Sequence, residues 1–385
     1  MFHIATEEEI KSGKVTDVYF QRTLEILKAR GINKRVVAEI WTKGLPSDWD
    51  WAVFAGVEEC IELLKDIPIH LNGLREGTIF SPFQPVLEIE GYYQDFAILE
   101  TAILGFICQA SGIATAAARC KKAAGDRPVI SFGARRMHPS ISPMIERSAF
   151  IGGCDGVAVV KSAEFIGEEP VGTMPHALIL VMGDTVEATK AFHEIIPEKV
   201  NRVSLIDTFN DEKFAAIEVA EALGKDLYAV RLDTPSSRRG NFLQIVEEVR
   251  WELNLRGFQQ VKIFVSGNID VAAIQRLNKV VDAYGVGTYI SNAPVIDFSM
   301  DIVEIEGEPI AKRGKISGRK ELLRCPNCFQ SLVKPKGNKD TVCTCGGSIE
   351  SLTTPLIKEG KLVADLPRPQ EIRSYVLNQL AKLSL

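Results

Sequence analysis

The sequence predicts an α/β protein with a parallel sheet in its middle third, and three observations support this fold class. Short apolar runs rich in β-branched residues recur between residues 129 and 287. Helical patterns separate these runs, and alternation at this spacing is typical of βα units. Glycines and charged residues fall at or just past the ends of the runs. About six units in series favour a barrel, although an open doubly wound sheet differs little in sequence.

Composition limits the class of protein further. The chain has 385 residues, 46% of them hydrophobic and 25% charged, and its formal net charge is −5. These values are ordinary for a globular protein of two or three domains, and they argue against disorder, a collagen-like chain or a coiled coil. A mildly acidic chain has no general electrostatic attraction to nucleic acid or anionic membranes, so we expect neither as a partner.

The first third of the chain mixes short helices and strands. Glu58–Lys65 has an amphipathic helical pattern, and Val86–Tyr92 alternates as a half-buried strand does. The apolar stretch Phe96–Ala118 contains Glu100, and we interpret it as a buried core helix. Residues 1–10 are acidic rather than basic, which is unlike a secretory signal. We therefore expect a cytoplasmic protein.

The expected strands of the parallel sheet follow in order. They are Val129–Phe132, Gly156–Val160, Val203–Asp207, Leu227–Asp233, Lys262–Val265 and the run that ends at Gly287. A helical pattern over Lys213–Leu223 ends at Gly224, and a second one, 242–253, has Gly257 as its expected C-cap. Beyond residue 290 we expect a hairpin at Val303–Ile310, a basic segment at 312–324 and a proline-rich tail.

Residues that could bind a ligand or take part in catalysis lie at the carboxyl ends of these strands. They are Arg135, Asp207, Arg231, Asp233, Gly267 and Gly287. That edge carries the chemistry in βα barrels and in open α/β sheets alike. Arginines suit carboxylates and phosphates, and the two aspartates could hold Mg²⁺ or accept sugar hydroxyls. Simple ion pairing at the mouth of a barrel is the alternative.

Two glycine-containing turns are candidates for a phosphate site. Gly285-Val-Gly287 is followed by Thr288, and Ser266-Gly267 ends the preceding strand. Backbone N–H groups in such turns can hold a phosphate, whereas a tight turn without a ligand is the structural alternative.

His176 is the candidate nucleophile or acid/base. It lies in Gly172-Thr-Met-Pro-His176, which places it on a loop that opens a helix. His138 competes for this role.

Four of the eight cysteines form a cluster with the spacing of a metal site. Cys325-Pro-Asn-Cys328 and Cys343-Thr-Cys345 supply four thiolates, which fit a structural Zn²⁺ ion in a small subdomain. A nucleic-acid-binding knuckle is the functional alternative. The remaining cysteines are expected as buried small hydrophobic residues.

Taken together, the motifs resemble the nicotinate phosphoribosyltransferase family in its archaeal form with a C-terminal zinc knuckle. The resemblance covers essentially the whole chain, and its motifs occur in the expected order. They are Thr16-Asp17-Val-Tyr19, Ser131-Phe-Gly-Ala-Arg135-Arg136, Gly172-Thr173-Met-Pro-His176, Arg231-Leu-Asp233-Thr, Ser266-Gly267, Gly285-Val-Gly287 and Lys315-Ile-Ser-Gly-Arg-Lys320.

The resemblance implies an architecture and an oligomeric state. It implies an N-terminal α/β sandwich at 1–112, completed by 290–322, and an irregular TIM-like α/β barrel at 113–289. Residues 323–385 would form the zinc-knuckle subdomain and the tail. A homodimer or higher homo-oligomer would share each active site between two chains.

The resemblance also implies a reaction, in which nicotinate and phosphoribosyl pyrophosphate (PRPP) give nicotinate mononucleotide and pyrophosphate in NAD salvage. Mg²⁺ would accompany PRPP, and ATP would act as a co-substrate through a phosphohistidine at His176. The implied catalytic residues are His176, Asp233, Arg231 and Asp207. The implied substrate-binding residues are Tyr19, Phe132, Arg135, Asp155 and Thr173. The implied phosphate-binding residues are Ser266, Gly267, Gly285, Gly287 and Thr288.

The expected roles follow the charges that develop in such a transfer. Phe132 and a partner chain's Tyr19 would enclose the pyridine ring, and Arg135 would face its carboxylate. Asp233 would hold the ribose hydroxyls, with Arg231 on the pyrophosphate side.

Asp155 departs from this pattern. It lies where related nicotinamide-using enzymes carry an aspartate, and an ionised carboxylate there would repel nicotinate. Nicotinamide and quinolinate therefore remain alternative acceptors. A barrel aldolase or decarboxylase and, more distantly, a zinc-dependent nucleic-acid-binding protein are alternatives from other classes.

Overall fold

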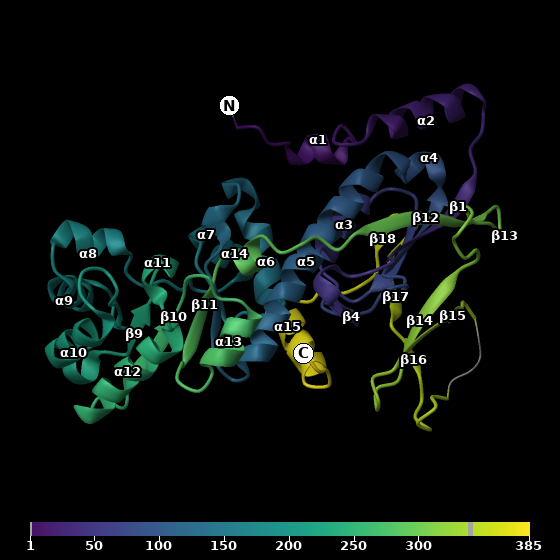
Figure 1. Cartoon of the computed structure of the whole chain (residues 1–385). Helices are drawn as coiled ribbons and strands as arrows, with labels where there is room; N and C mark the ends of the chain where they lie inside the picture. The colour runs from purple at the N-terminus through teal and green to yellow at the C-terminus, as the bar shows by residue number, and fades with distance from the viewer. Residues whose placement is uncertain (1, 338–341) are drawn as a thin grey trace. The chain divides into compact units, whose positions relative to one another are not determined.

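A computed structural model describes residues 2–337 and 342–385 (Figure 1). The chain divides into two compact units, residues 1–115 with 294–384 and residues 116–293. Residues 323–337 and 342–384, which belong to the expected zinc-knuckle subdomain and tail, group with the first unit.

The first unit is built on a seven-stranded antiparallel sheet with the order β13-β12-β1-β5-β3-β17-β18. Its strands are β1 (Arg35–Thr42), β3 (His70–Leu74), β5 (Leu87–Tyr92), β12 (Phe298–Ile305), β13 (Glu308–Pro309), β17 (Thr353–Lys358) and β18 (Lys361–Leu362). Strand β1, the third in this order, is buried along most of its length, and Ala38 pairs with Ile89 on one side and Ile302 on the other. Segments from both ends of the chain therefore complete one sheet.

The helices of the first unit surround this sheet and a small two-stranded one, β2 (Ala52–Val53) with β4 (Ile79–Phe80). They are α1 (Glu7–Lys11), α2 (Val18–Ala29), α3 (Val57–Leu64), α4 (Tyr93–Phe96), most of α5 (Glu100–Ala124), α15 (Pro369–Leu380) and the 3₁₀ turns η1 (Pro46–Asp48) and η2 (Ala97–Leu99).

The helical stretch Tyr93–Ala124 is the long apolar segment of the described residues. Its most apolar window has a mean hydropathy of 1.7, enough to cross a membrane by composition, and 56% of that window is buried inside the structure. A core helix has the same properties, as the sequence predicts.

A three-stranded sheet in the first unit carries the cysteine cluster. Its order is β15-β14-β16, with β14 (Lys320–Arg324), β15 (Ser331–Pro335) and β16 (Glu350–Ser351). Cys325 and Cys328 lie in the turn between β14 and β15, and Cys343 and Cys345 precede β16.

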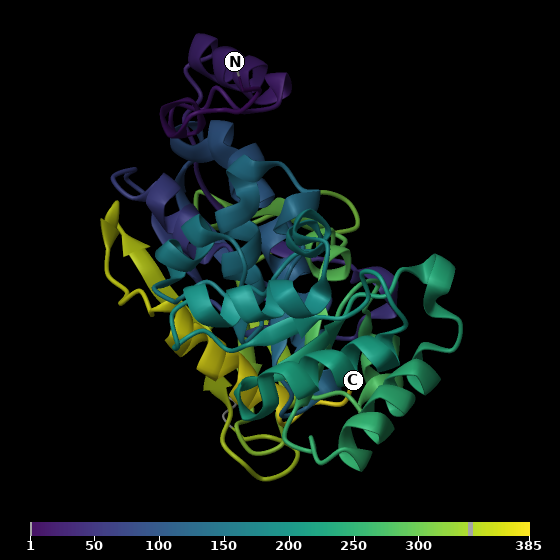
Figure 2. The ribbon, with the colours of Figure 1, turned by 90° about the vertical axis from the view of Figure 1, so that its left-hand side faces the viewer.

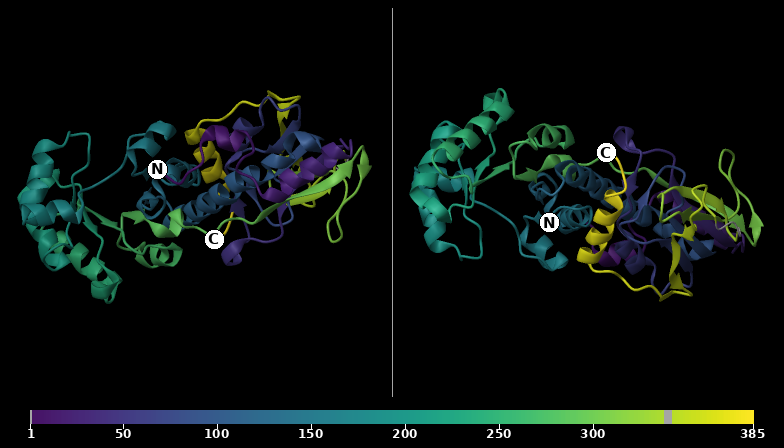
Figure 3. Two further views of the ribbon diagram at one scale, coloured as in Figure 1. Left: turned by 90° about the horizontal axis from the view of Figure 1, so that it is seen from above. Right: turned by 90° about the horizontal axis from the view of Figure 1, so that it is seen from below.

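The second unit is a six-stranded parallel sheet with helices between its strands. The order is β7-β6-β11-β10-β9-β8, with β6 (Val129–Ser131), β7 (Gly156–Val157), β8 (Val203–Leu205), β9 (Ala229–Leu232), β10 (Lys262–Val265) and β11 (Ala283–Val286). The helices are α6 (Ser142–Ile151), α7 (Val160–Ile166), α8 (His176–Met182), α9 (Thr185–Ile195), α10 (Glu212–Leu223), α11 (Ser236–Arg239), α12 (Phe242–Leu255), α13 (Val271–Leu277) and α14 (Thr288–Ser291). The 3₁₀ turns are η3 (Ala134–Arg136), η4 (Pro139–Ile141) and η5 (Gly224–Asp226). Helices α9, α10 and α12 lie side by side along the strands (Figures 2 and 3).

The sheet of the second unit is a half-barrel, so the closed barrel expected from the sequence is not found. The two edge strands β7 and β8 do not pair with each other in the described residues. Extended residues 171–175 lie between them instead. The Val171 N–H donates to the Val157 carbonyl at 2.8 Å, and Met174 packs on Leu205 of β8. Gly172 and Pro175 interrupt this segment, and proline has no N–H for a ladder.

Alternate side chains of the half-barrel fill its inner face. Ile130, Val203, Ala229 and Phe264 form a buried cluster there. Phe132 packs against this cluster from the carboxyl end of the strands. Beyond this apolar cluster, toward the carboxyl ends of the strands, polar side chains become accessible to a ligand.

Candidate active site

The carboxyl ends of β8, β9 and β10 bring four sequence-predicted residues together. Asp207 is two residues beyond β8, Arg231 is the third residue of β9, Asp233 follows β9, and Ser266 follows β10. Parallel neighbours end at the same edge of a sheet, so residues far apart in sequence meet there.

Arg231 is the centre of this cluster. Its Nε donates to Ser266 Oγ at 3.0 Å and its Nη1 donates to Thr173 Oγ1 at 2.8 Å. Its Nη2 lies 3.6 Å from Asp233 Oδ2. Burial lowers the pKa of Arg231, and the two nearby aspartates oppose this effect. The guanidinium is thus a fixed cation in a poorly solvated position.

Asp207 is a buried carboxylate whose side chain is 2% exposed. Among the described residues, neither of its oxygens has a partner in full hydrogen-bond geometry. Burial raises the pKa of Asp207, the charge of His176 lowers it, and Asp233 raises it again. A buried carboxylate that lacks a hydrogen-bond partner is unusual in a folded protein and marks a candidate ligand position.

His176 begins α8, directly after Pro175, and faces both acids. Its Nδ1 lies 3.0 Å from Thr208 Oγ1. Its Nε2 lies 3.7 Å from Asp207 Oδ2 and 3.8 Å from Asp233 Oδ2. Thr208 was not predicted from the sequence, because a single threonine after a strand belongs to no recognisable motif. Its hydrogen bond orients the imidazole so that Nε2 points at the carboxylates.

Phe132 supplies an aromatic surface beside the cluster. The Arg231 guanidinium lies 5.2 Å from the centre of its ring, and the Phe264 ring lies 5.8 Å away. A Cβ at Gly285 would come within 2.5 Å of the Phe132 ring. Gly285, predicted as a phosphate ligand, therefore makes room for this ring.

Arg135 is an exposed cation on η3 near the same cluster. Its charge contributes to the lowered pKa of Arg231, and it has no hydrogen-bond or ion-pair partner among residues 2–337 and 342–385. It is therefore available to an anionic ligand.

Gly267 forms the turn after β10 with a φ of +75°. A Cβ there would lie 2.8 Å from Asp233 Oδ1, so the position favours glycine sterically and conformationally. Arg239 fastens the turn by donating to the Gly267 carbonyl at 2.6 Å and to the Thr234 carbonyl at 3.1 Å.

Gly287 and Thr288 lie at the end of β11, where α14 begins. The space beside Gly287 is open, and Thr288 is exposed. Their phosphate-binding role stays a prediction.

The structure does not bring Asp155 into this cluster. Asp155 Oδ2 pairs with Lys121 Nζ at 3.0 Å and accepts from the Val129 N–H at 2.8 Å. Val129 is the first residue of β6, so Asp155 lies at the opposite, amino end of the strands. Its carboxylate is engaged in holding α5 to β6.

Two other predicted residues belong to other elements. Tyr19 is on α2 in the first unit and is 56% exposed. His138 caps η4, where its Nδ1 lies 2.6 Å from Ser140 Oγ.

One cavity of the second unit, about 820 Å³, opens at the amino ends of the strands. Its arginines are already engaged. Arg250 pairs with Asp282 at 2.7 Å, and Arg127 donates to the Val281 carbonyl at 2.8 Å. The carboxyl ends, where Arg135 has no such partner among the described residues, are therefore the candidate active site.

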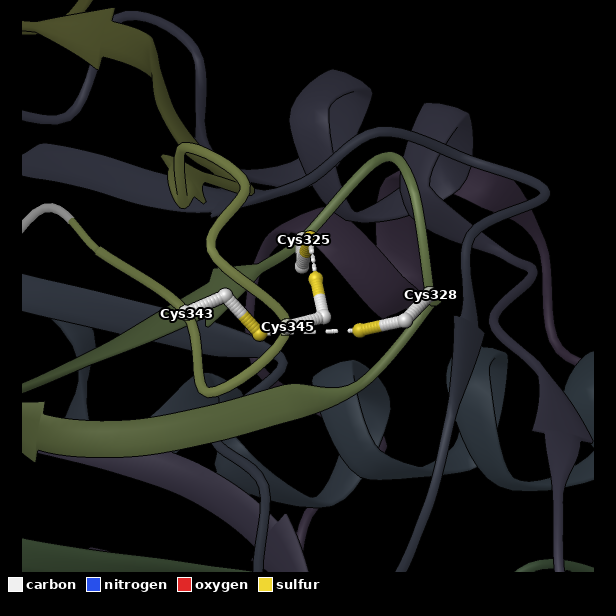
Figure 4. Close-up of side chains that lie close together, drawn as sticks. All are labelled: Cys325, Cys328, Cys343 and Cys345. Atoms are coloured by element: carbon white, nitrogen blue, oxygen red, sulfur yellow. Dashed lines mark hydrogen bonds between the residues drawn. The ribbon is translucent and has the colours of Figure 1, made fainter.

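The four predicted metal ligands converge in the first unit, and their side chains point toward one another (Figure 4). All four sulfur atoms lie within 4.8 Å of one another, with Cys325 to Cys345 and Cys328 to Cys343 at 3.5 Å. The backbone N–H of Cys345 lowers the pKa of the Cys343 thiol to about 6. A thiolate-rich cluster of this size could hold a tetrahedral metal ion such as zinc.

Comparison with known proteins identifies the family. The model of the quinolinate phosphoribosyl transferase N-terminal domain matches residues 17–111, and that of the C-terminal domain matches residues 113–301. The chain belongs to the quinolinate phosphoribosyltransferase family. It is an enzyme of the phosphoribosyltransferase type, in keeping with the class expected from the sequence.

Individual relatives carry two kinds of name. A crystal structure of nicotinate-nucleotide pyrophosphorylase from Pyrococcus furiosus is 56% identical, with a TM-score of 0.98 over 100% of this chain and 99% of that one. Nicotinate phosphoribosyltransferase pncB1 of Mycobacterium tuberculosis is 28% identical over 92% of this chain and 87% of that protein. Human nicotinic acid phosphoribosyltransferase, at 20% identity and a TM-score of 0.78, covers 96% of this chain and 94% of its own and shares the fold.

These findings correct the expectation that nicotinate is the acceptor. Both family models are those of quinolinate enzymes, and the relatives named for nicotinate are much less similar than the pyrophosphorylase. The motifs at the strand ends do not specify the acceptor, because arginines at a strand end suit carboxylates and phosphates alike.

Proposed function

We propose that the chain transfers the phosphoribosyl group of PRPP to quinolinate and releases pyrophosphate and carbon dioxide. The observation that carries this proposal is the match of the two quinolinate family models to both units of the chain. The name of the 56% identical pyrophosphorylase agrees, because nicotinate mononucleotide is the product that this reaction would leave.

The reaction balances without a further reagent. The pyridine nitrogen attacks C1 of the ribose, and the bond from C1 to the pyrophosphate oxygen breaks. The bond between C2 of the ring and its carboxyl group then breaks, carbon dioxide leaves, and a proton takes its place. Loss of carbon dioxide drives the reaction forward, so this proposal requires no ATP and no phosphohistidine.

The cations of the site suit a substrate with two carboxylates. Arg231 is fixed and poorly solvated, and Arg135 is exposed without a partner. We assign the two guanidinium groups to the two carboxylates, since guanidinium binds carboxylate in a planar fork. The Phe132 ring would lie against the pyridine ring.

The acids suit the sugar and its developing charge. Positive charge builds on C1 as pyrophosphate leaves, and Asp233 and Asp207 lie at the same edge to stabilise it. Asp233, 29% exposed, is the acid we assign to the ribose hydroxyls. His176 Nε2 is the candidate proton donor to the leaving pyrophosphate.

Mg²⁺ would accompany PRPP. The unpartnered carboxylate of Asp207 fits such an ion, because Mg²⁺ prefers carboxylate and phosphate oxygens. The ion would neutralise charge on the pyrophosphate when bound. Gly267 and Gly287 would face the 5′-phosphate.

We assign a structural Zn²⁺ ion to Cys325, Cys328, Cys343 and Cys345, because four converging sulfurs leave no open coordination position. A second copy of the chain would complete the site with its Tyr19. Exposed Val18, Tyr19 and Ile26 give α2 an apolar face for such contact.

The test is a parallel assay of pyrophosphate release from PRPP and Mg²⁺ with quinolinate, nicotinate or nicotinamide, each with and without ATP. Release with quinolinate, independent of ATP, is the expected result. Release with nicotinate or nicotinamide but not with quinolinate would overturn the proposal.

A further inference from the structure

The guanidinium of Arg231 is held by two neutral hydroxyl groups rather than by a carboxylate. Ser266 Oγ accepts from Nε at 3.0 Å, and Thr173 Oγ1 accepts from Nη1 at 2.8 Å. Asp233 Oδ2 lies 3.6 Å from Nη2, beyond the distance of a direct hydrogen bond. Neutral partners fix the plane of the cation without cancelling its charge.

Ser266 also holds Asp233. Its hydroxyl donates to Asp233 Oδ1 at 2.8 Å while it accepts from Arg231. A free arginine and carboxylate usually close to a direct contact of about 2.7–2.9 Å. The serine hydroxyl therefore stands between a cation and an anion that would otherwise pair.

The position of this hydroxyl is set by the sheet. Phe264 of β10 is level with Arg231 of β9, and the Ser266 N–H donates to the Leu232 carbonyl at 2.9 Å. Ser266 is only 3% exposed. A buried, backbone-anchored serine cannot move aside to let Arg231 and Asp233 meet.

We infer that Ser266 and Thr173 are positioning residues that keep Arg231 and Asp233 apart, so that each charge stays available to the substrate. Two hydrogen bonds hold the guanidinium, and its Nη2 end remains open to an anionic group. The Ser266 hydroxyl, predicted as a phosphate ligand, is occupied by this task. The inference about the protein rests on geometry alone, and its kinetic consequence rests on the proposed function.

The experiment compares crystal structures and kinetics of the wild type, Ser266→Ala, Thr173→Val and Thr173→Ser. In Ser266→Ala we expect the Arg231–Asp233 separation to fall from 3.6 Å to below about 3 Å. We expect the KM for quinolinate to rise about tenfold, the effect of one lost hydrogen bond to a charged group, with a smaller change in kcat. Thr173→Val should raise the same KM, and Thr173→Ser, which keeps the hydroxyl, should restore it.

Ser204→Ala is the matched control. Ser204 is a fully buried serine on the neighbouring strand β8, and its hydroxyl lies 2.7 Å from Thr189 Oγ1, away from the cluster. Loss of stability with an unchanged KM is expected for this variant.

Two results would overturn the inference. One is an unchanged Arg231–Asp233 separation in the Ser266→Ala crystal structure. The other is a KM that rises equally in Ser204→Ala. If the wild type does not use quinolinate, the proposed function is wrong. The Arg231–Asp233 distance in the Ser266→Ala crystal structure still tests the inference in that case.

Discussion

Asp207 combines deep burial with the proximity of a second acid, Asp233. Burial raises its pKa above the ordinary 3.8, so the folded chain binds this proton more tightly than the unfolded chain does. Its contribution to the free energy of unfolding is therefore present at low pH and falls as pH rises through the raised pKa.

This sign predicts the effect of Asp207→Asn. The variant should lose transferase activity but gain thermal stability at pH 7.5, by roughly 2–4 °C for about 1 kcal/mol. At pH 4, where the wild-type carboxyl is protonated for a larger fraction of the time, the gain should shrink. Melting curves of both proteins at the two pH values measure it, and an equal gain at both would contradict the assignment.

Arg135 is predicted to bind a carboxylate of the acceptor. Arg135→Ala should raise the KM for quinolinate about tenfold and leave the KM for PRPP nearly unchanged. The neighbouring exposed Arg136 is the matched control, because its charge is not among those that act on Arg231. Equal KM values for Arg135→Ala and Arg136→Ala would remove Arg135 from the site.

At the scale of residues, the sequence located charged groups better than it located neutral ones. Arg231 and Asp233 were conspicuous as charges at strand ends, and His176 was conspicuous on a loop that opens a helix. Thr208 and the bridging role of Ser266 were not predictable, because the role of a hydroxyl group depends on hydrogen-bond partners that are distant in sequence. Asp155 was assigned to the substrate by resemblance alone, although it directly precedes the expected strand Gly156–Val160 and therefore lies at the amino end of that strand.

At the scale of elements, β11 and the Phe132 ring approach closely at Gly285. Gly285→Ala should place a Cβ about 2.5 Å from that ring and displace it. We expect a loss of about 1–3 kcal/mol in the free energy of unfolding, together with a fall in kcat/KM.

Gly105→Ala is the control for this prediction. Gly105 lies in α5 with open space beside it, and alanine is the better helix former. Denaturant unfolding should show no loss of stability there. A Gly285→Ala protein with wild-type stability and activity would mean that the ring position does not matter.

The turn between β14 and β15 is predicted to depend on metal. We expect about one zinc ion per purified chain, and Cys325→Ser should lose it and melt at a lower temperature. Cys60→Ala, which removes a buried thiol outside the cluster, should keep the metal. Elemental analysis of the wild type, Cys325→Ser and Cys60→Ala measures the zinc content of each. A metal content unchanged in Cys325→Ser would exclude the site.

The elements missed by sequence analysis are those defined by long-range pairing. Strands and helices of the second unit were predictable from apolar runs and their spacing. That β17 joins the main sheet beside β3 was not, because this pairing links Thr353 with Leu74 across most of the chain. The open edge of the half-barrel was not predictable either. It is occupied by residues 171–175, in which Gly172 and Pro175 interrupt a strand pattern.

At the scale of the whole molecule, the basic segment 312–324 serves the fold of the first unit. Lys320 pairs with the buried Glu39 at 2.8 Å, and Arg319 pairs with the buried Glu88 at 2.5 Å. Removing one partner of such a pair would leave a buried charge uncompensated. These cations are engaged inside the protein, which weakens the nucleic-acid-binding alternative.

The central claim is that the chain makes a pyridine nucleotide from quinolinate with loss of one carboxyl group. The most direct test uses quinolinate labelled in its 2-carboxyl carbon, with PRPP and Mg²⁺, and compares labelled carbon dioxide with pyrophosphate. We expect equal amounts of labelled carbon dioxide and pyrophosphate, with or without ATP. Pyrophosphate release without labelled carbon dioxide, or turnover of nicotinate alone, would contradict it.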